Sequence, residues 1–229
     1  MSSNPPVSIR VLLVDDHPFL RQGVALNLKG TGDIEVCGEA PDSDTAVRVA
    51  AETRPDVVVT DLTLPDKSGL ELIRILRDQN PGVNILVLSM HDEDSYAERC
   101  LRAGAKGYLM KSRGPDQLAF AIREIAAGRI YVSPDLAQRL LTSLTHAPSA
   151  QLNERADEFK DLSDREFEVF ELLGRGKTSK EIGSMLGISS KTVDVHRMNI
   201  RQKLHVKTNP DLIHQAVRWV QSNEASGGV

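Results

Sequence analysis

The amino-acid sequence predicts an α/β domain followed by a smaller all-α domain. Between residues 9 and 128, short apolar runs alternate with amphipathic stretches of helical periodicity, whereas only helical patterns recur from residue 160 to about 221. A chain of 229 residues is long enough for two domains that each bury a core. Strands that alternate with helices indicate βα units around a parallel sheet, and this number of units favours a flavodoxin-like wound fold.

The expected strands are the apolar runs, and their repetition favours strands over isolated buried helical segments. The five predicted strands are Ile9–Val14, Ile34–Gly38, Val57–Thr60, Ile85–Leu88 and Gly107–Met110. The five helices expected after them lie near residues 18–29, 43–53, 68–78, 94–103 and 115–127. This order corresponds to a five-stranded parallel sheet covered by helices on both faces.

The second domain follows a segment in which both patterns lapse. We expect the first domain at 7–128, a linker with a short helix near 134–144 at 129–159, and the second domain at 160–224. Capping boxes, in which Ser or Thr precedes Glu by three residues, mark two helix starts in the second domain. They are Ser163 with Glu166 and Thr178 with Glu181.

Composition is ordinary for a globular protein, but charge is unevenly distributed. The chain is 40% hydrophobic with a net charge of −4, yet residues 174–208 carry eight Lys or Arg and two acids. A basic segment in an acidic chain indicates a polyanionic partner, with a solvated face as the alternative. Two cysteines, no apolar run of membrane-spanning length and no signal peptide lead us to expect a cytoplasmic protein without a membrane partner.

Polar residues stand at the ends of the predicted strands. Asp15 and Asp16 follow the first strand, Asp61 the third, Ser89 the fourth and Lys111 the fifth. Because the carboxyl ends of parallel strands meet at one edge, we expect these five residues to share a ligand site. A single acid in such a place is more often a satisfied turn residue, so the prediction depends on the joint pattern.

The residue types at this edge are suited to phosphoryl transfer. Three clustered carboxylates repel one another and require a cation, and oxygen ligands favour Mg²⁺. A carboxylate beside Mg²⁺ can attack phosphorus, and Asp61 is the best candidate because it ends a central strand. Lys111 and Ser89 can then neutralise charge on the transferred oxygens.

Four segments resemble the receiver domain of two-component response regulators: VLLVDDHP, VVVTDLTLPDKSG, ILVLSMHDE and GAKGYLMKS. The resemblance implies that Asp61 is the phosphoacceptor for a sensor histidine kinase. It also implies a Mg²⁺ site formed by Asp15, Asp16, Asp61 and the backbone carbonyl of Thr63. Such a domain catalyses its own phosphorylation and slow dephosphorylation, and it is otherwise not an enzyme.

The same resemblance assigns roles to residues on the fourth and fifth strands. Ser89 and Lys111 would hold the phosphoryl group, and Tyr108 would change rotamer when the Ser89 hydroxyl moves toward phosphate. A tyrosine at the edge of the core is the alternative reading of Tyr108. Met90 is bulkier than the small residue often found at its position, so it would narrow access to Asp61.

The second domain contains a helix-turn-helix pattern formed by helices at 178–187 and 191–204, with Ser189 or Ser190 capping the second helix. The inward side of the second helix is expected to comprise Val193, Ile200 and Leu204. Its outward side is expected to comprise Asp194, Val195, Arg197, Met198, Arg201 and Gln202. Arg can read guanine in the major groove, and apolar side chains can contact the thymine methyl group.

The stretch from Leu162 to about Val220 resembles the LuxR-type DNA-binding domain, through the segments SKEIG and LGISSKTVDVHR. Together the two resemblances identify a NarL/FixJ-type regulator that binds double-stranded DNA. The expected DNA-contacting residues are Lys180, Lys191, Thr192, Asp194, Val195, His196, Arg197, Met198, Arg201 and Lys203. Asp194 departs from the family pattern, since it places an acid where many relatives face DNA with a non-acidic residue.

A fourth helix, capped by Asn209 and running to about residue 221, carries an apolar stripe that can pack inward or pair two domains. We expect a homodimer when the protein is phosphorylated or bound to DNA. Unphosphorylated receiver would restrain the DNA-binding domain. One alternative is a phosphohydrolase, although Thr63 stands where its second acid is expected. The other is an output domain that binds protein rather than DNA, or a receiver that acts without phosphorylation.

Overall fold

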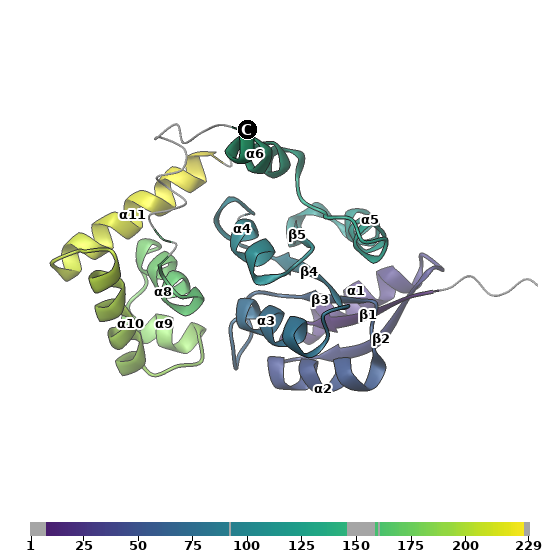
Figure 1. The fold of residues 1–229 in the computed structure, drawn as a ribbon. Coiled ribbons are helices and arrows are strands. Elements are labelled where there is room, and N and C mark those ends of the chain that lie inside the picture. The colour runs from purple at the N-terminus through teal and green to yellow at the C-terminus, as the bar shows by residue number, and fades with distance from the viewer. Residues whose placement is uncertain (1–7, 92, 146–158, 160, 227–229) are drawn as a thin grey trace, which may run out of the picture. The chain divides into compact units, whose positions relative to one another are not determined.

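The computed structural model describes residues 8–91, 93–145, 159 and 161–226, which form two compact units (Figure 1). The first unit ends at Leu136 and the second begins at Ala137, inside one helix. Most of the predicted linker, from residue 146 to 158, lies outside the described residues. Among the described helices, none is long and apolar enough to cross a membrane.

A five-stranded parallel sheet forms the centre of the first unit, with strand order β2-β1-β3-β4-β5. The strands are β1 (Ile9–Val14), β2 (Ile34–Ala40), β3 (Val57–Thr60), β4 (Asn84–Ser89) and β5 (Gly107–Met110). All residues of β3 are buried because the strand lies between β1 and β4 and is covered on both faces. The predicted flavodoxin-like fold is therefore confirmed, with β2 and β4 slightly longer than predicted.

Helices cover the sheet on both faces. The helices of this unit are α1 (Pro18–Lys29), α2 (Ser43–Thr53), α3 (Gly69–Gln79), α4 (Glu93–Ala103), η1 (Lys111–Arg113), α5 (Pro115–Ala126) and the start of α6 (Pro134–Thr145). Helix α1 packs against α5, while α3 packs against both α2 and α4. An apolar core lies between α1, α5 and the sheet, and it includes Leu28, Ile122 and Ile125. The loops that follow the strands therefore form the surface at the carboxyl edge of the sheet.

Four helices form the described core of the second unit. They are α8 (Asp164–Gly174), α9 (Ser179–Met185), α10 (Ser190–Lys203) and α11 (Asn209–Ser226). Both predicted capping boxes are present, at Ser163 with Glu166 and at Thr178 with Glu181. Phe159, Phe167 and Phe170 surround Trp219 of α11, with ring centroids 5.2–6.1 Å from it. This aromatic cluster joins α8 to α11.

The start of α11 differs from the prediction. The Thr208 hydroxyl accepts a hydrogen bond from Asp211 N at 3.2 Å, and Asn209 is already the first helical residue. The predicted cap at Asn209 is wrong by one position, because a threonine three residues before Asp211 reaches its N–H. For α10 the cap is Ser189, whose side chain accepts from Thr192 N at 3.0 Å.

Candidate functional site

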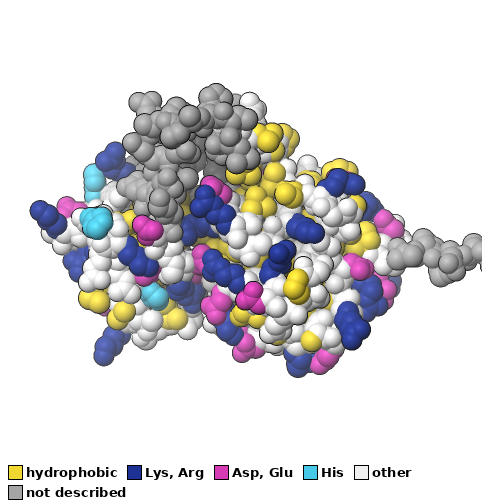
Figure 2. Space-filling model, in the orientation of Figure 1, with side chains coloured by type: hydrophobic (Ala, Val, Ile, Leu, Met, Phe, Trp, Pro, Cys, Tyr) yellow, Lys and Arg dark blue, Asp and Glu magenta, His cyan; other side chains and the backbone are white. Residues whose placement is uncertain are grey.

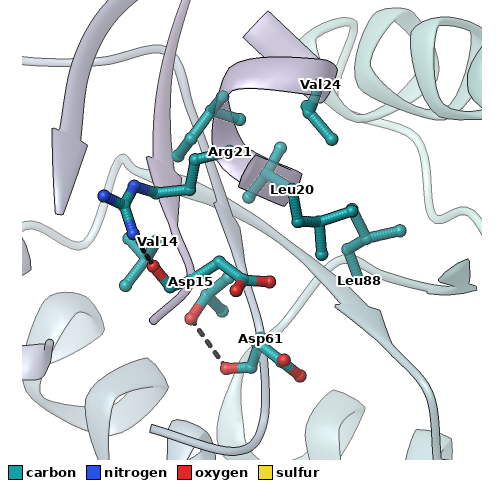
Figure 3. A pocket seen from close by; sticks show the side chains of 10 residues that line it. Val14, Asp15, Leu20, Arg21, Val24, Asp61 and Leu88 are labelled. Carbon is teal, nitrogen blue, oxygen red and sulfur yellow. Dashed lines mark hydrogen bonds between the residues drawn. The ribbon is translucent and has the colours of Figure 1, made fainter. Parts of the chain in front are cut away.

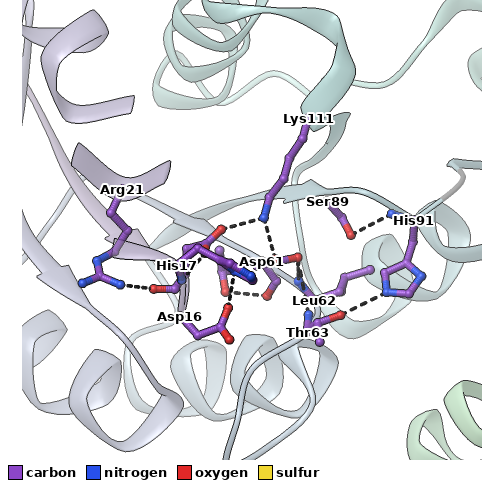
Figure 4. A network of polar contacts seen from close by, with 11 residues as sticks. Asp16, His17, Arg21, Asp61, Leu62, Thr63, Ser89, His91 and Lys111 are labelled. Carbon is purple, nitrogen blue, oxygen red and sulfur yellow. Dashed lines mark hydrogen bonds and ion pairs between the residues drawn. The ribbon is translucent and has the colours of Figure 1, made fainter. Parts of the chain in front are cut away.

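One lysine joins two acids at the carboxyl edge of the sheet. Lys111 Nζ lies 2.6 Å from Asp15 Oδ2 and 2.6 Å from Asp61 Oδ2 (Figure 4). Asp15 follows β1, Asp61 follows β3 and Lys111 follows β5, so the fold brings together residues 96 and 50 positions from the lysine. The three side chains are at most 10% exposed. This is the convergence expected from parallel strands that end at one edge.

The environment of Lys111 favours the charged form of its ammonium group. Burial alone would lower the pKa of Lys111, but the charge of Asp61 and the hydrogen bonds to Asp15 and Asp61 raise that pKa above its ordinary value. One backbone contact also fixes the Asp61 carboxylate, since Leu62 N donates to Asp61 Oδ1 at 2.6 Å. The nucleophile candidate is therefore held at both oxygens.

The acids outnumber the cation at this edge. Asp16 stands beside Asp15, and Asp16 Oδ1 lies 2.6 Å from His17 Nδ1. One ligand atom each from Asp15, Asp16 and His17 all lie within 4.8 Å of one another. Two carboxylates contact the ammonium and a third, that of Asp16, stands beside them. The surplus of negative charge and of carboxylate oxygens that can act as metal ligands fits a small divalent cation such as Mg²⁺.

An apolar recess lies behind the two buried acids (Figure 3). Asp15 and Asp61 stand at its polar end. Its apolar lining includes Leu13, Leu20, Val24, Val59 and Leu88. Apolar surroundings reduce the local screening of charge, so they strengthen the attraction between the lysine and the two carboxylates.

A second set of polar contacts centres on His91, in the loop between β4 and α4. The Ser89 hydroxyl, which is fully buried, accepts a hydrogen bond from His91 N at 3.2 Å. The Tyr108 hydroxyl donates to His91 O at 2.8 Å, and the Thr63 hydroxyl lies 3.0 Å from His91 Nε2. Thr63 joins the two sets, because its N–H also donates to Asp61 Oδ1 at 3.4 Å (Figure 4).

The loop after Asp61 is anchored on both sides. A Cβ on Gly69 would lie 2.4 Å from Asp61 O, so glycine permits α3 to begin close to the acid. Asp66 accepts hydrogen bonds from Ser43 N at 3.0 Å and Asp44 N at 3.1 Å, at the start of α2. Burial would raise the pKa of Asp66, but these backbone hydrogen bonds lower it overall. These contacts fix the loop that follows Asp61 to the start of α2.

Exposed polar and apolar residues share the surface of α10. Val195 and Met198 are each 45% exposed, whereas Val193 and Ile200 are fully buried. Lys191 and Thr192 are also exposed at the start of the helix. On the face of the helical unit seen in Figure 2, basic and hydrophobic side chains are interspersed. This mixture can pair with phosphates and with the methyl groups of thymine.

Arg197 is less exposed than the sequence predicts. Its side chain is 19% exposed and donates to the Ser179 hydroxyl at 2.8 Å. Ser179 in turn donates to Asp194 Oδ1 at 2.8 Å, and the guanidinium lies 3.7 Å from the same carboxylate. The expectation that Arg197 points outward is therefore corrected, because a partner on α9 and an acid one turn away hold it against the protein.

Lys203 and His196, two further predicted DNA contacts, lie against other residues of the same domain. Lys203 Nζ lies 2.6 Å from Glu166 Oε2, and Glu166 is buried. Burial would raise the pKa of Glu166, but hydrogen bonds from Lys203 and Ser163 lower it overall. Burial lowers the pKa of His196, which favours its neutral form, and its Nδ1 is buried with no hydrogen-bond partner among the described residues. His196 therefore behaves as a packed residue in this structure.

Both units match known families. Residues 11–123 match the response regulator receiver domain, and residues 160–216 match the luxR family of bacterial regulatory proteins. The chain is a two-component response regulator. It acts as a transcription regulator, and its family consists of regulators rather than conventional enzymes.

Several relatives support this assignment, two of them along nearly the whole chain. The oxygen regulatory protein NreC of Staphylococcus carnosus is 34% identical over 92% of this chain and 97% of its own length. The crystal structure of a LuxR-family two-component response regulator from an Aurantimonas species is 40% identical, with a TM-score of 0.56, over 61% of this chain and 99% of that one. RcsB from Salmonella enterica serovar Typhimurium, bound to a promoter with the phosphomimetic BeF3-, is 26% identical over 94% of this chain and 99% of that one, with a TM-score of 0.60.

Three residues at this candidate site were not predicted from the sequence. His91 bridges two loops, His17 lies beside the acid pair, and the Arg21 guanidinium donates to Asp15 O. His17 and His91 stood within the motif segments DDHP and LSMHDE, one position after Asp16 and two after Ser89. That nearness was an available signal, whereas Arg21 gave none because its contact depends on how α1 packs.

Proposed function

We propose that Asp61 accepts a phosphoryl group from a sensor histidine kinase and that the LuxR-type domain binds double-stranded DNA in response. The observation that carries the first part is the Lys111 ammonium, which lies 2.6 Å from both Asp15 and Asp61. An oxygen of Asp61 attacks phosphorus, and the new O–P bond forms as the N–P bond to the donor imidazole breaks. Lys111 then offers positive charge to the transferred phosphoryl oxygens.

Asp15, Asp16, Asp61 and the backbone carbonyl of Thr63 are the proposed Mg²⁺ ligands. The surplus of carboxylates over ammonium groups supports this assignment. When bound, Mg²⁺ supplies positive charge opposite the phosphoryl oxygens. Autophosphorylation from small donors and slow autodephosphorylation at Asp61 follow from the same groups.

Ser89 and Tyr108 are the proposed reporters of phosphorylation. Ser89 would donate its hydroxyl to the phosphoryl group, a step that changes its contact with His91 N. Tyr108 is buried, and its hydroxyl is tied to His91 O, so movement of this loop alters the environment of the tyrosine. If this contact set has a second arrangement when Asp61 is phosphorylated, the change can bias the whole receiver.

DNA recognition is assigned to α9 and α10. Exposed Val195 and Met198 would contact base edges, and the basic residues would contact phosphates. Arg197 can read guanine only after it leaves Ser179, so Asp194 and Ser179 together limit its freedom. The full proposed set is Lys180, Lys191, Thr192, Asp194, Val195, His196, Arg197, Met198, Arg201 and Lys203.

Phosphorylation is proposed to release or dimerise the output domain, with the protein acting in the cytoplasm as a homodimer on DNA. The proposed divisions are a receiver at 7–128, a linker at 129–159 and a DNA-binding domain at 160–224. Two LuxR-type domains on half-sites about one DNA turn apart would match a two-fold dimer.

The decisive experiment compares DNA affinity with and without a small phosphodonor plus Mg²⁺, in wild type and Asp61→Ala. We expect phosphoryl incorporation and tighter DNA binding in the wild type only. Asp78→Ala, which removes an exposed carboxylate of α3, is the matched control and should behave as the wild type. Equal DNA affinity in all samples would overturn the switch, and many turnovers of a phosphate ester would favour a phosphohydrolase.

A further inference from the structure

A short segment after α5 is attached to the edge of the sheet through its backbone. Tyr131 forms a single parallel bridge with Gly107 of β5. Its N–H donates to Lys106 O at 2.9 Å, and its carbonyl accepts from Tyr108 N at 3.0 Å. A Cβ on Gly107 would lie 2.7 Å from Tyr131 O, so glycine permits this close approach. The segment covers the edge that β5 would otherwise present.

The same segment is attached to the start of α4 by a buried acid. Glu93, the first residue of α4, is 9% exposed, and its Oε1 accepts a hydrogen bond from Ser133 N at 2.9 Å. The Ser133 hydroxyl caps α6 by accepting from Leu136 N at 3.1 Å. Leu136 is itself 5% exposed. We call residues 130–136 the strap, since they connect the sheet, α4 and α6.

The end of β4 and the start of α4 link the strap to the proposed phosphorylation site. Three described residues supply the contacts: Ser89 through its hydroxyl, His91 through the carbonyl that accepts from Tyr108, and Glu93 through its carboxyl group. Tyr108 is thus held at its hydroxyl by His91, and at its N–H by the strap. Because Ser89 and Glu93 are four positions apart in the chain, a shift of Ser89 toward a phosphoryl group would also move the Glu93 carboxyl group.

The strap cannot follow such a shift freely, because its backbone is paired with β5. Ser133 lies two residues beyond Tyr131, which is fixed to the sheet on both sides of its peptide. A hydrogen bond of 2.9 Å between Ser133 N and Glu93 weakens steeply when its partners separate by a fraction of an ångström. Movement of Glu93 is therefore expected to act first on this contact.

We propose that Glu93 is a positioning residue that holds the strap to α4 in the unphosphorylated receiver, and that phosphorylation releases it. The proposal rests on phosphorylation of Asp61. The strap leads directly into α6, within which the first compact unit ends. Release would therefore loosen the start of the connection to the LuxR-type domain and reduce the restraint on DNA binding.

Hydrogen exchange of the full-length protein tests the attachment itself. Without phosphodonor, Glu93→Ala should speed exchange in peptides covering residues 130–136 about tenfold, equivalent to about 1.4 kcal/mol. Glu93→Gln keeps an oxygen acceptor and should restore slow exchange. Glu98→Ala, which removes an α4 ion pair with Arg102, is the matched control and should leave the strap unchanged. Unchanged exchange in Glu93→Ala would overturn the proposal.

DNA affinity tests whether the contact matters for output. Glu93→Ala should bind DNA without phosphodonor nearly as tightly as phosphorylated wild type, while Glu93→Gln should remain dependent on the donor. Phosphorylated wild type should also show faster exchange at 130–136. Glu93→Ala could speed hydrogen exchange in the strap and yet leave DNA affinity without phosphodonor unchanged. That result would overturn the proposed role of Glu93, because a merely structural residue gives it.

The two proposals fail in distinguishable ways, because phosphoryl incorporation is measured on the same samples by mass spectrometry. No incorporation at Asp61 in the wild type would contradict the proposed function itself. Full incorporation without any change of exchange in the strap would contradict only the coupling through Glu93.

Discussion

Replacement of Lys111 by methionine isolates the electrostatic role of the lysine. Methionine keeps much of the aliphatic volume but removes the ammonium that lies 2.6 Å from Asp15 and from Asp61. Removing one partner of a buried ion pair costs about 3–5 kcal/mol. Asp15 and Asp61 keep backbone hydrogen bonds from His17 N and Leu62 N, at 2.7 and 2.6 Å, which favours the lower end of that range.

We therefore expect Lys111→Met to lower the free energy of unfolding of the receiver by about 3 kcal/mol without Mg²⁺. For a urea m-value of about 1.5 kcal/mol/M, the midpoint falls by about 2 M. Hydrogen exchange of peptides from β1 and β3 during urea titration of the full-length protein reports this unit separately. Added Mg²⁺ should restore more stability to the variant than to the wild type, because binding to the folded state is stabilising.

Lys67→Met is the matched control for this experiment. Lys67 pairs with Asp44, whose side chain is 80% exposed, so its loss should cost less than about 1 kcal/mol. Equal urea midpoints for Lys111→Met and the wild type in Mg²⁺-free buffer would refute the reasoning. Such a result would mean that Asp15 and Asp61 are satisfied without the ammonium.

Three further predictions concern other parts of the response regulator. Gly107→Ala should destabilise the receiver by about 1–3 kcal/mol in thermal unfolding, since the added methyl meets Tyr131 O at 2.7 Å; an unchanged melting temperature would contradict this. Burial holds the pKa of His196 below its ordinary value, so the DNA-binding unit should lose stability as pH falls below about 6.5. In urea titrations followed by Trp219 fluorescence, the His196→Gln variant should lose less stability than the wild type over this pH range. Equal losses in the two proteins would contradict the prediction. Asp194→Asn keeps an acceptor for Ser179 but removes negative charge from α10, so DNA affinity should rise severalfold at low salt and little at high salt; a decrease at low salt would show that the acid itself contacts DNA.

Local sequence patterns determined the elements of this response regulator. Apolar runs and helical periodicity gave the strands and helices with small errors at their ends, because burial on a sheet or helix face imposes a period of its own. The capping boxes at Ser163 and Thr178 formed as predicted, since a box uses only residues within one turn. The Thr208 cap was missed because its neighbour Asn209 carries an equally suitable side chain.

The meeting of Asp15, Asp61 and Lys111 also followed from the sequence. Parallel strands have one chemical direction, so residues that end different strands must share an edge, however far apart they lie in the chain. The prediction needed the strand assignment and no knowledge of side-chain packing.

Tertiary structure alone decided which polar groups pair across elements. The bridge from His91 to Thr63, the inward turn of Arg197 and the contact between Glu93 and Ser133 each join residues of different loops or helices. Periodicity identifies the buried face of an element, but a hydrogen bond depends on distances of a few tenths of an ångström between elements. The sequence by itself therefore determined the site and its acids, and packing determined how that site is connected to the rest of the protein.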